Sequence, residues 1–202
     1  MKWKLNKVTQ ETNHPFLNFF TLTYEVTSDD GKTKTYDYYM TSRRSKDELL
    51  VISYNFVKPD GIVIPLYYKD KDGKIFILLT KQFRPSVGRY LTSFVAGLVD
   101  SSDKNIEEVI KREAKEEAGA IVTDIEILSS PAPTSVGISD EINMVALARI
   151  DHFESNKLEE FEDISVKLYD LDTIKKMLND SNYLFPVNIR ILLLYLFKRF
   201  EN

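Results

Sequence analysis

The stretch GLVDSSDKNIEEVIKREAKEEAG, from Gly97 to Gly119, decides how the fold of this 202-residue chain is interpreted. Asn105, with Glu108 three residues later, has the pattern of a helix N-cap and its capping-box partner. Gly119 suits the left-handed residue that follows a last helical turn. The stretch therefore predicts a short helix whose two ends are defined by its own sequence.

Two acidic residues of this predicted helix lie on its apolar face. At about 100° per residue, Glu113 and Glu117 project to the same side as Ile106, Val109 and Ile110. Burying an isolated carboxylate is strongly unfavourable, so each acid must be protonated, paired with a cationic side chain or bound to a metal ion. An internal salt bridge and a hard metal ion both satisfy this requirement, and the metal ion is the simplest partner.

The opposite side of the helix carries charges at the spacing of a solvated surface. Glu107 and Lys111 are four residues apart, as are Glu108 and Arg112, and such pairs stabilise exposed helices. We therefore expect both pairs on the solvent side.

The segment from Arg112 to Ala120, REAKEEAGA, resembles the second half of the signature of Nudix hydrolases, in which Arg-Glu is followed by Glu-Glu and a Gly. The first half departs from that signature. Fourteen residues separate Gly97 from Arg112, one more than in the family, and Asp103 or Lys104 stands where the family has its first Glu.

Three further segments resemble the ADP-ribose pyrophosphatase branch of that family. KQFRPSVGRYLTSFVAGLVD, residues 81–100, is similar to its block of Gln, an aromatic residue and Arg followed after three residues by Gly-Arg, and to the turn that follows. SVGISDEINMVALA, residues 135–148, is similar to its Ser-Asp-Glu loop and the next strand, and ISVKLYDLDTIKKML resembles the strand and helix that close the domain. The chain departs from the branch pattern at Ser93, Val95 and Val136.

The resemblance implies an α+β fold, a Nudix-type αβα sandwich with a mixed β-sheet and a small N-terminal antiparallel β extension. We place the extension in residues 1–57, where it is expected to serve dimerisation. The Nudix hydrolase domain is expected in residues 58–202.

Local patterns predict several elements directly. Alternating side chains around Asp29-Asp30-Gly31 predict a hairpin of strands near Phe19–Thr27 and Lys32–Met40. VTDIEILSSPAPTS predicts a strand followed by a proline-rich loop. Helical spacing predicts helices over Thr173–Leu178 and Val187–Phe200.

Hydrolysis of a diphosphate requires neutralisation of phosphate oxygens, and magnesium does this with oxygen ligands. By resemblance, Glu113 and Glu117 are the principal ligands and act in catalysis. Glu116 assists, and the backbone carbonyl of Ala96 supplies a further ligand. We therefore expect Mg²⁺ as the cofactor, with Mn²⁺ as a substitute.

Further catalytic and binding residues follow from the same resemblance. Glu141 matches the Glu of the Ser-Asp-Glu loop and is the expected additional catalytic acid, with Asp140 as the nearest alternative. Arg84 is the expected substrate contact, because a guanidinium makes paired hydrogen bonds to phosphate oxygens. Solvated loop acids and a surface ion pair are the alternative roles. Arg112 is expected to orient the helix, and residues 129–140 to form a mobile lid.

The expected reaction is Mg²⁺-dependent hydrolysis of a nucleoside diphosphate linked to another moiety, with ADP-ribose converted to AMP and ribose 5-phosphate. One alternative is a nucleotide-sugar pyrophosphatase on the same fold. A second is a nucleotide-binding sensor with weakened catalysis, suggested by the longer loop and by the departures at Ser93 and at the first signature Glu. The resemblance also implies a homodimer.

The composition and the apolar segments argue against several other classes of function. A net charge of −4 argues against a nucleic-acid surface, and the lack of cysteine excludes disulfides and thiolate chemistry. The start, MKWKLNKVTQ, lacks the apolar core of a signal peptide, and the apolar run Ile191–Phe197 is far below the ~20 residues that span a bilayer. We therefore expect a cytoplasmic protein without membrane or nucleic-acid partners.

Overall fold

The computed structural model divides into two compact units. The structure describes residues 1–100, 102–155 and 163–201. The first unit contains Met1–Asp60 and Pro131–Asn143, and the second contains Gly61–Ser130 and Met144–Asn202. Residues 131–143 thus pack with the N-terminal unit, whereas the division predicted from the sequence leaves them with the hydrolase domain. The role of residues 1–57 in dimerisation stays a prediction.

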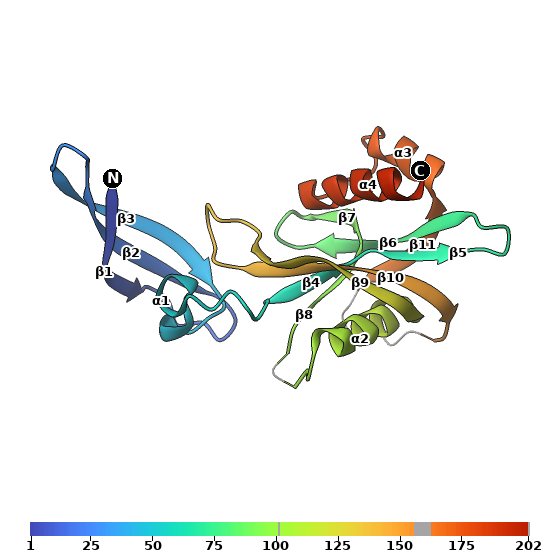
Figure 1. The fold of residues 1–202 in the computed structure, drawn as a ribbon, viewed down its shortest axis with the longest axis horizontal. Helices are drawn as coiled ribbons and strands as arrows, with labels where there is room; N and C mark the ends of the chain where they lie inside the picture. Colours follow the sequence, from blue (N-terminus) through green and yellow to red (C-terminus); the bar gives the residue numbers. More distant parts are fainter. Residues whose placement is uncertain (101, 156–162, 202) are drawn as a thin grey trace. The chain divides into compact units, whose positions relative to one another are not determined.

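The first unit is built on a three-stranded antiparallel sheet (Figure 1). Its strands are β1 (Lys2–Gln10), β2 (Asn18–Thr27) and β3 (Thr33–Ser42). The predicted hairpin corresponds to β2 and β3, with Gly31 at the turn at φ 83°. Sequence patterns do not predict β1, because this edge strand lacks a continuous apolar face and buries only Val8.

One small core holds the first unit together. Two short helices follow β3, the 3-10 helix η1 (Lys46–Glu48) and α1 (Leu50–Ser53). Leu49, between them, is fully buried against one face of the sheet. The cluster consists of Val8, Phe20, Leu22, Met40 and Leu49.

The second unit contains a mixed sheet. Its strands are β4 (Gly61–Ile64), β5 (Leu66–Lys69), β6 (Ile75–Arg84), β7 (Arg89–Ser93), β8 (Val95–Leu98), β9 (Ala120–Pro133), β10 (Ile142–Phe153) and β11 (Ile164–Asp170). They follow the order β11-β6-β5-β10-β4-β8, with β7 beside β6 and β9 beside β10. β5 is parallel to β10 and antiparallel to β6. The predicted mixed sheet is therefore confirmed.

Helices cover both faces of this sheet (Figure 1). α2 (Ile106–Ala118) packs on one face in a cluster that includes Ile64 of β4. Val63, the preceding residue, belongs to the cluster on the other face, because successive strand residues project to opposite sides. That second cluster includes residues of α3 (Leu171–Leu178) and α4 (Val187–Phe200). These three layers form the predicted αβα sandwich.

Helix α2 begins and ends where the sequence predicts. The Asn105 side chain accepts a hydrogen bond from the Glu108 N–H at 2.9 Å, and Gly119 takes the left-handed conformation at φ 61°. The reciprocal half of the capping box differs, since the Glu108 carboxylate accepts from the N–H of Lys104 at 3.3 Å instead of from Asn105. The position of α2 is thus fixed by local interactions.

Two other boundaries differ from the prediction. β9 continues through Pro131 and Pro133, which the sequence places in a loop. A strand with one neighbour tolerates proline where no N–H is needed for pairing, and β9 pairs with β10 alone. α3 begins at Leu171, two residues before Thr173. Within the described ranges, no helix combines the length and apolar character needed to cross a bilayer.

Replacing Asn105 with Ala should lower the free energy of unfolding by about 1 kcal/mol, because the Glu108 N–H loses its side-chain acceptor. Asn105→Ser retains an acceptor and is the matched control. Urea unfolding followed by circular dichroism measures both variants. Equal unfolding midpoints for the Ala and Ser variants would contradict the capping role.

Candidate active site

A cleft of about 380 Å³ opens beside α2 in the second unit. Three elements meet there: the end of β6, strand β8 with the residues after it, and one face of α2. The lining residues are Gln82, Arg84, Ala96, Gly97, Leu98, Asp100, Arg112, Glu113, Glu116 and Glu117. The cleft therefore brings together Arg84 and all four residues predicted as metal ligands.

Glu113 lies against bare backbone of β8. The residue is only 7% exposed. A Cβ atom added at Gly97 would lie 1.9 Å from Cδ of Glu113 and 2.0 Å from one of its oxygens. The glycine that opens the signature stretch therefore leaves the space that the Glu113 carboxylate fills.

Glu117, one helical turn later, meets the same strand. It is 8% exposed, and its Oε2 accepts a hydrogen bond of 3.4 Å from the backbone N–H of Ala96. Both acids thus point into the protein as the helical pattern predicts.

Arg112 supplies positive charge to the acids of the cleft. Its NH1 lies 2.7 Å from Oε1 of Glu113 and 3.2 Å from Oε2 of Glu116. The internal salt bridge considered for the sequence is therefore present at Glu113. The orienting role expected for Arg112 stays a prediction that these contacts support.

Of the two ion pairs predicted on the solvent side of α2, one forms and the other does not. Glu107 and Lys111 form the expected ion pair at 2.5 Å. The predicted pair of Glu108 with Arg112 is wrong, because Arg112 turns toward the cleft while Glu108 lies 4.0 Å from Lys104. The angular position of a Cα atom does not fix where a long, flexible arginine side chain ends.

Asp103 forms an ion pair with the NH2 group of Arg112. The sequence alone does not decide whether Asp103 or Lys104 stands where the family has its first Glu. The Asp103 side chain is 9% exposed and lies 3.2 Å from NH2 of Arg112. Burial lowers the pKa of the Arg112 guanidinium. The hydrogen bond to Asp103, the charge of Glu113 and the hydrogen bond to Glu116 raise this pKa by more, so the net shift is upward. Asp103, not the exposed Lys104, therefore stands opposite Arg112.

The donor set of the cleft suits a hard divalent cation. Four carboxylates and two guanidiniums line it, so its charge is negative, and the acidic donors are oxygens, which Mg²⁺ and Mn²⁺ prefer. In the described part of the chain, no three acidic or histidine side chains are gathered closely enough to hold a metal ion. Arg112 contacts both Glu113 and Glu116, so a cation bound by these acids must share them with Arg112 or displace it.

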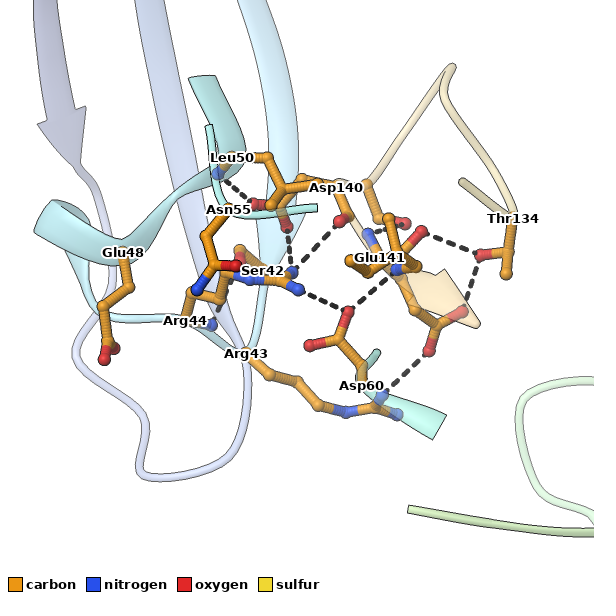
Figure 2. Close-up of polar contacts among 12 residues, drawn as sticks. Ser42, Arg43, Arg44, Glu48, Leu50, Asn55, Asp60, Thr134, Asp140 and Glu141 are labelled. Carbon is orange, nitrogen blue, oxygen red and sulfur yellow. Dashed lines mark hydrogen bonds and ion pairs between the residues drawn. The ribbon is translucent and has the colours of Figure 1, made fainter. Parts of the chain in front are cut away.

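Glu141 lies in the first unit, directly before β10. Figure 2 shows its carboxylate held from two sides. Arg43 NH1 lies 2.8 Å from Oε1, and the Thr134 hydroxyl donates to Oε2 at 2.7 Å. The predicted catalytic acids are thus divided between the units, with Glu113 and Glu117 in the second.

Asp140 makes hydrogen bonds that hold neighbouring segments of the chain together (Figure 2). Its Oδ2 accepts from the Leu50 N–H at 3.1 Å, and its carbonyl accepts from Arg44 at 3.0 Å. Oδ1 lies 3.5 Å from Arg44 NH1, which is an ion-pair contact without a hydrogen bond. Arg44 also lies 2.7 Å from Asp60, whose Oδ2 accepts from the Ile142 N–H. These bonds commit Asp140 to fixing the segment, and leave Glu141, 33% exposed at its side chain, as the more accessible acid.

Within the segment predicted as a lid, residues 129–140, residues 136 and 138 are hydrogen-bonded to β3 of the first unit. The Thr41 N–H donates to the Ile138 carbonyl at 2.8 Å, and the Tyr38 hydroxyl donates to the Val136 carbonyl at 2.8 Å. A lid movement must break these bonds or carry β3 with it. The movement itself stays a prediction.

The three layers and the acid-lined cleft are the arrangement that the resemblance to Nudix hydrolases predicts, and comparison with known families tests it. The family model described as the NUDIX domain matches residues 57–186. The chain therefore belongs to the Nudix family.

Individual relatives are similar over shorter stretches. An uncharacterized Nudix hydrolase of Schizosaccharomyces pombe is 42% identical over 52 residues, which cover 26% of this chain and 25% of that protein. A Caenorhabditis elegans protein named as a nudix hydrolase is 30% identical over 92 residues, which cover 46% of this chain and 40% of that protein. The chain thus matches less than half the length of these two relatives.

A solved structure is similar over the whole chain. The crystal structure of an ADP compounds hydrolase has a TM-score of 0.72 and covers 100% of this chain and 95% of its own, at 15% sequence identity. This similarity confirms the predicted fold, including the small N-terminal sheet.

Replacing Gly97 with Ala should weaken Mn²⁺ binding about tenfold or more, because the new Cβ displaces the carboxylate end of Glu113. The fold should persist, since the displaced atoms belong to a flexible side chain. Electron paramagnetic resonance of free Mn²⁺ measures the affinity, and circular dichroism the melting temperature. Gly137→Ala, where a Cβ meets nothing within 4 Å, is the matched control. Unchanged Mn²⁺ affinity in the Gly97 variant would refute the assigned role of Glu113.

Proposed function

We propose that this protein hydrolyses the diphosphate linkage of a nucleoside diphosphate joined to another moiety, and that its substrate is ADP-ribose. The observation that carries this proposal is the placement of Glu113 and Glu117, both buried on α2, at a negatively charged cleft that Arg84 also lines. Water adds to one phosphorus atom and a bridging P–O bond breaks, which yields AMP and ribose 5-phosphate.

Different residues of the cleft are proposed to bind the metal ion and the phosphate. A bound Mg²⁺ ion supplies the neutralisation of phosphate oxygens that lets water approach the diphosphate. Glu113 and Glu117 would hold that ion, Glu116 and the Ala96 carbonyl would be its further protein ligands, and Arg84 would bind a phosphate. The donor set supports this assignment, because carboxylate and carbonyl oxygens are the ligands that Mg²⁺ prefers.

Glu141 is the proposed acceptor of the proton that the attacking water loses. Arg43 and Thr134 hold its carboxylate in one orientation, which suits a general base that must meet water in a defined place. Asp140 is not proposed for this role, because its side chain is only 10% exposed, whereas that of Glu141 is 33% exposed.

A nucleotide-sugar pyrophosphatase on the same fold remains the alternative substrate assignment, and product analysis separates the two. The sensor alternative rests on the longer loop, the change at Ser93 and the loss of the first signature Glu. Asp103 still provides an acid opposite Arg112, which supports an active enzyme. The homodimer, the use of Mg²⁺ with Mn²⁺ as a substitute, and the cytoplasmic location are parts of the same proposal drawn from the family resemblance.

Incubation with ADP-ribose and Mg²⁺ should release AMP, and Glu113→Gln or Glu117→Gln should lower kcat by about 10²-fold or more, because each variant removes a charged metal ligand. Glu107→Gln, on the solvent side of the same helix, should retain activity. Chromatography of the nucleotide products provides the measurement. AMP release that survives both substitutions would falsify the site, whereas turnover of a nucleotide sugar alone would change only the substrate.

Glu141→Gln and Asp140→Asn should separate catalysis from stability. The Glu141 variant should lose about 10²-fold or more in kcat, with little change in unfolding free energy. The Asp140 variant should be destabilised by about 2 kcal/mol, because it removes the charge of a largely buried carboxylate that accepts from the Leu50 N–H and lies beside Arg44. Steady-state kinetics and urea unfolding test the pair. Loss of kcat in the Asp140 variant together with loss of stability in the Glu141 variant would show that Asp140 is the catalytic acid and Glu141 the structural one.

A further inference from the structure

The hairpin of β6 and β7 places two arginines directly opposite each other. In its register, Arg84 faces Arg89 across the last pair before the turn. The Gly88 N–H donates to the Arg84 carbonyl at 2.9 Å, and Gly88 takes a left-handed conformation at φ 67°. The turn therefore fixes the two backbone positions that carry the guanidiniums.

Both arginines belong to the face of the hairpin that lines the cleft. Opposed residues of an antiparallel pair project to one side, and their neighbours project to the other. Arg84 lines the cleft. The other face carries Phe83 and Tyr90, whose rings are 5.5 Å apart, and Lys81, whose Nζ lies 5.3 Å from the Tyr90 ring. Arg89 consequently shares the side of Arg84.

Neither arginine has an acidic partner among the residues that the structure describes. Both are exposed. Like charges directly opposite each other on neighbouring strands destabilise a hairpin. An arrangement that breaks a local stability rule without an evident compensation is typical of a functional site. Within the described ranges no acidic side chain balances the two charges, and the phosphates of a ligand can do so.

We propose that Arg89 acts together with Arg84 as a two-guanidinium clamp for the diphosphate of a nucleoside diphosphate, an inference that rests on the proposed function. Each guanidinium presents a planar fork that matches two phosphate oxygens, and a diphosphate offers two such groups. The arginines belong to β6 and β7, whereas the acids proposed to hold the cation belong to α2. Arg89 is thus a binding residue beyond Arg84, set by the register of the hairpin.

Isothermal titration with adenosine 5′-(α,β-methylene)diphosphate and Mg²⁺ tests the clamp without turnover, because the bridging carbon is not hydrolysed. Arg89→Gln should bind about tenfold more weakly than wild type. Arg89→Lys should fall between them, since it keeps the charge but loses the planar fork. Lys81→Gln, on the other face of the same hairpin, should bind as wild type. The melting temperature of Arg89→Gln should not fall, since the substitution removes like-charge repulsion.

Wild-type affinity in Arg89→Gln overturns the clamp, as does an equal loss in Lys81→Gln or a wild-type protein that does not bind the analogue. The proposed reaction is tested separately by AMP release from ADP-ribose. If the analogue binds through Arg89 but no AMP appears, the clamp stands and the reaction fails. If AMP appears and Arg89→Gln leaves both KM and analogue affinity unchanged, the reaction stands and the clamp fails.

Discussion

The structure of the site depends on the burial of two carboxylates on the apolar face of one helix. Glu113 and Glu117 leave water when α2 packs on the sheet, and an uncompensated buried carboxylate strongly destabilises a fold. The compensation comes from both sides of the cleft. Strand β8 offers bare backbone at Gly97 and an N–H at Ala96, and α2 itself offers Arg112. The two acids therefore meet backbone and a guanidinium at the cleft.

Arg112 compensates this charge only in part. It lies within ion-pair distance of Asp103, Glu113, Glu116 and, at 3.9 Å, Asp100, so a single guanidinium serves four acids. The remaining negative charge is what a divalent cation would neutralise. Asp103 is nearly buried and lies on the far side of Arg112 from the helix acids, so it can hold the guanidinium if a cation takes over Glu113 and Glu116. The departure from the family signature at this position therefore preserves an acid where one is needed.

Features set by neighbouring residues are predictable from this sequence, and features set by distant residues are not. Helix α2, its caps and its inward acids follow from spacing within one segment, as does the hairpin of β2 and β3. Strand β1 cannot be recognised from the sequence, because an edge strand that buries few side chains needs no apolar pattern. The direction of Arg112 depends on side-chain rotamers and on the loop that carries Asp103, and neither can be read from helical periodicity.

Asp140 and Glu141 show the same limit at two adjacent positions. Both match the acidic pair of the family loop, and no local pattern distinguishes them. Their partners do, and these lie 90 or more residues away in the sequence: Leu50 and Arg44 for Asp140, and Arg43 for Glu141. Because Asp140 fixes the backbone, Glu141 is positioned from the main chain as well as from Arg43 and Thr134. Both oxygens of Glu141 are held by residues of the first unit, so its side chain loses rotational freedom when this unit folds.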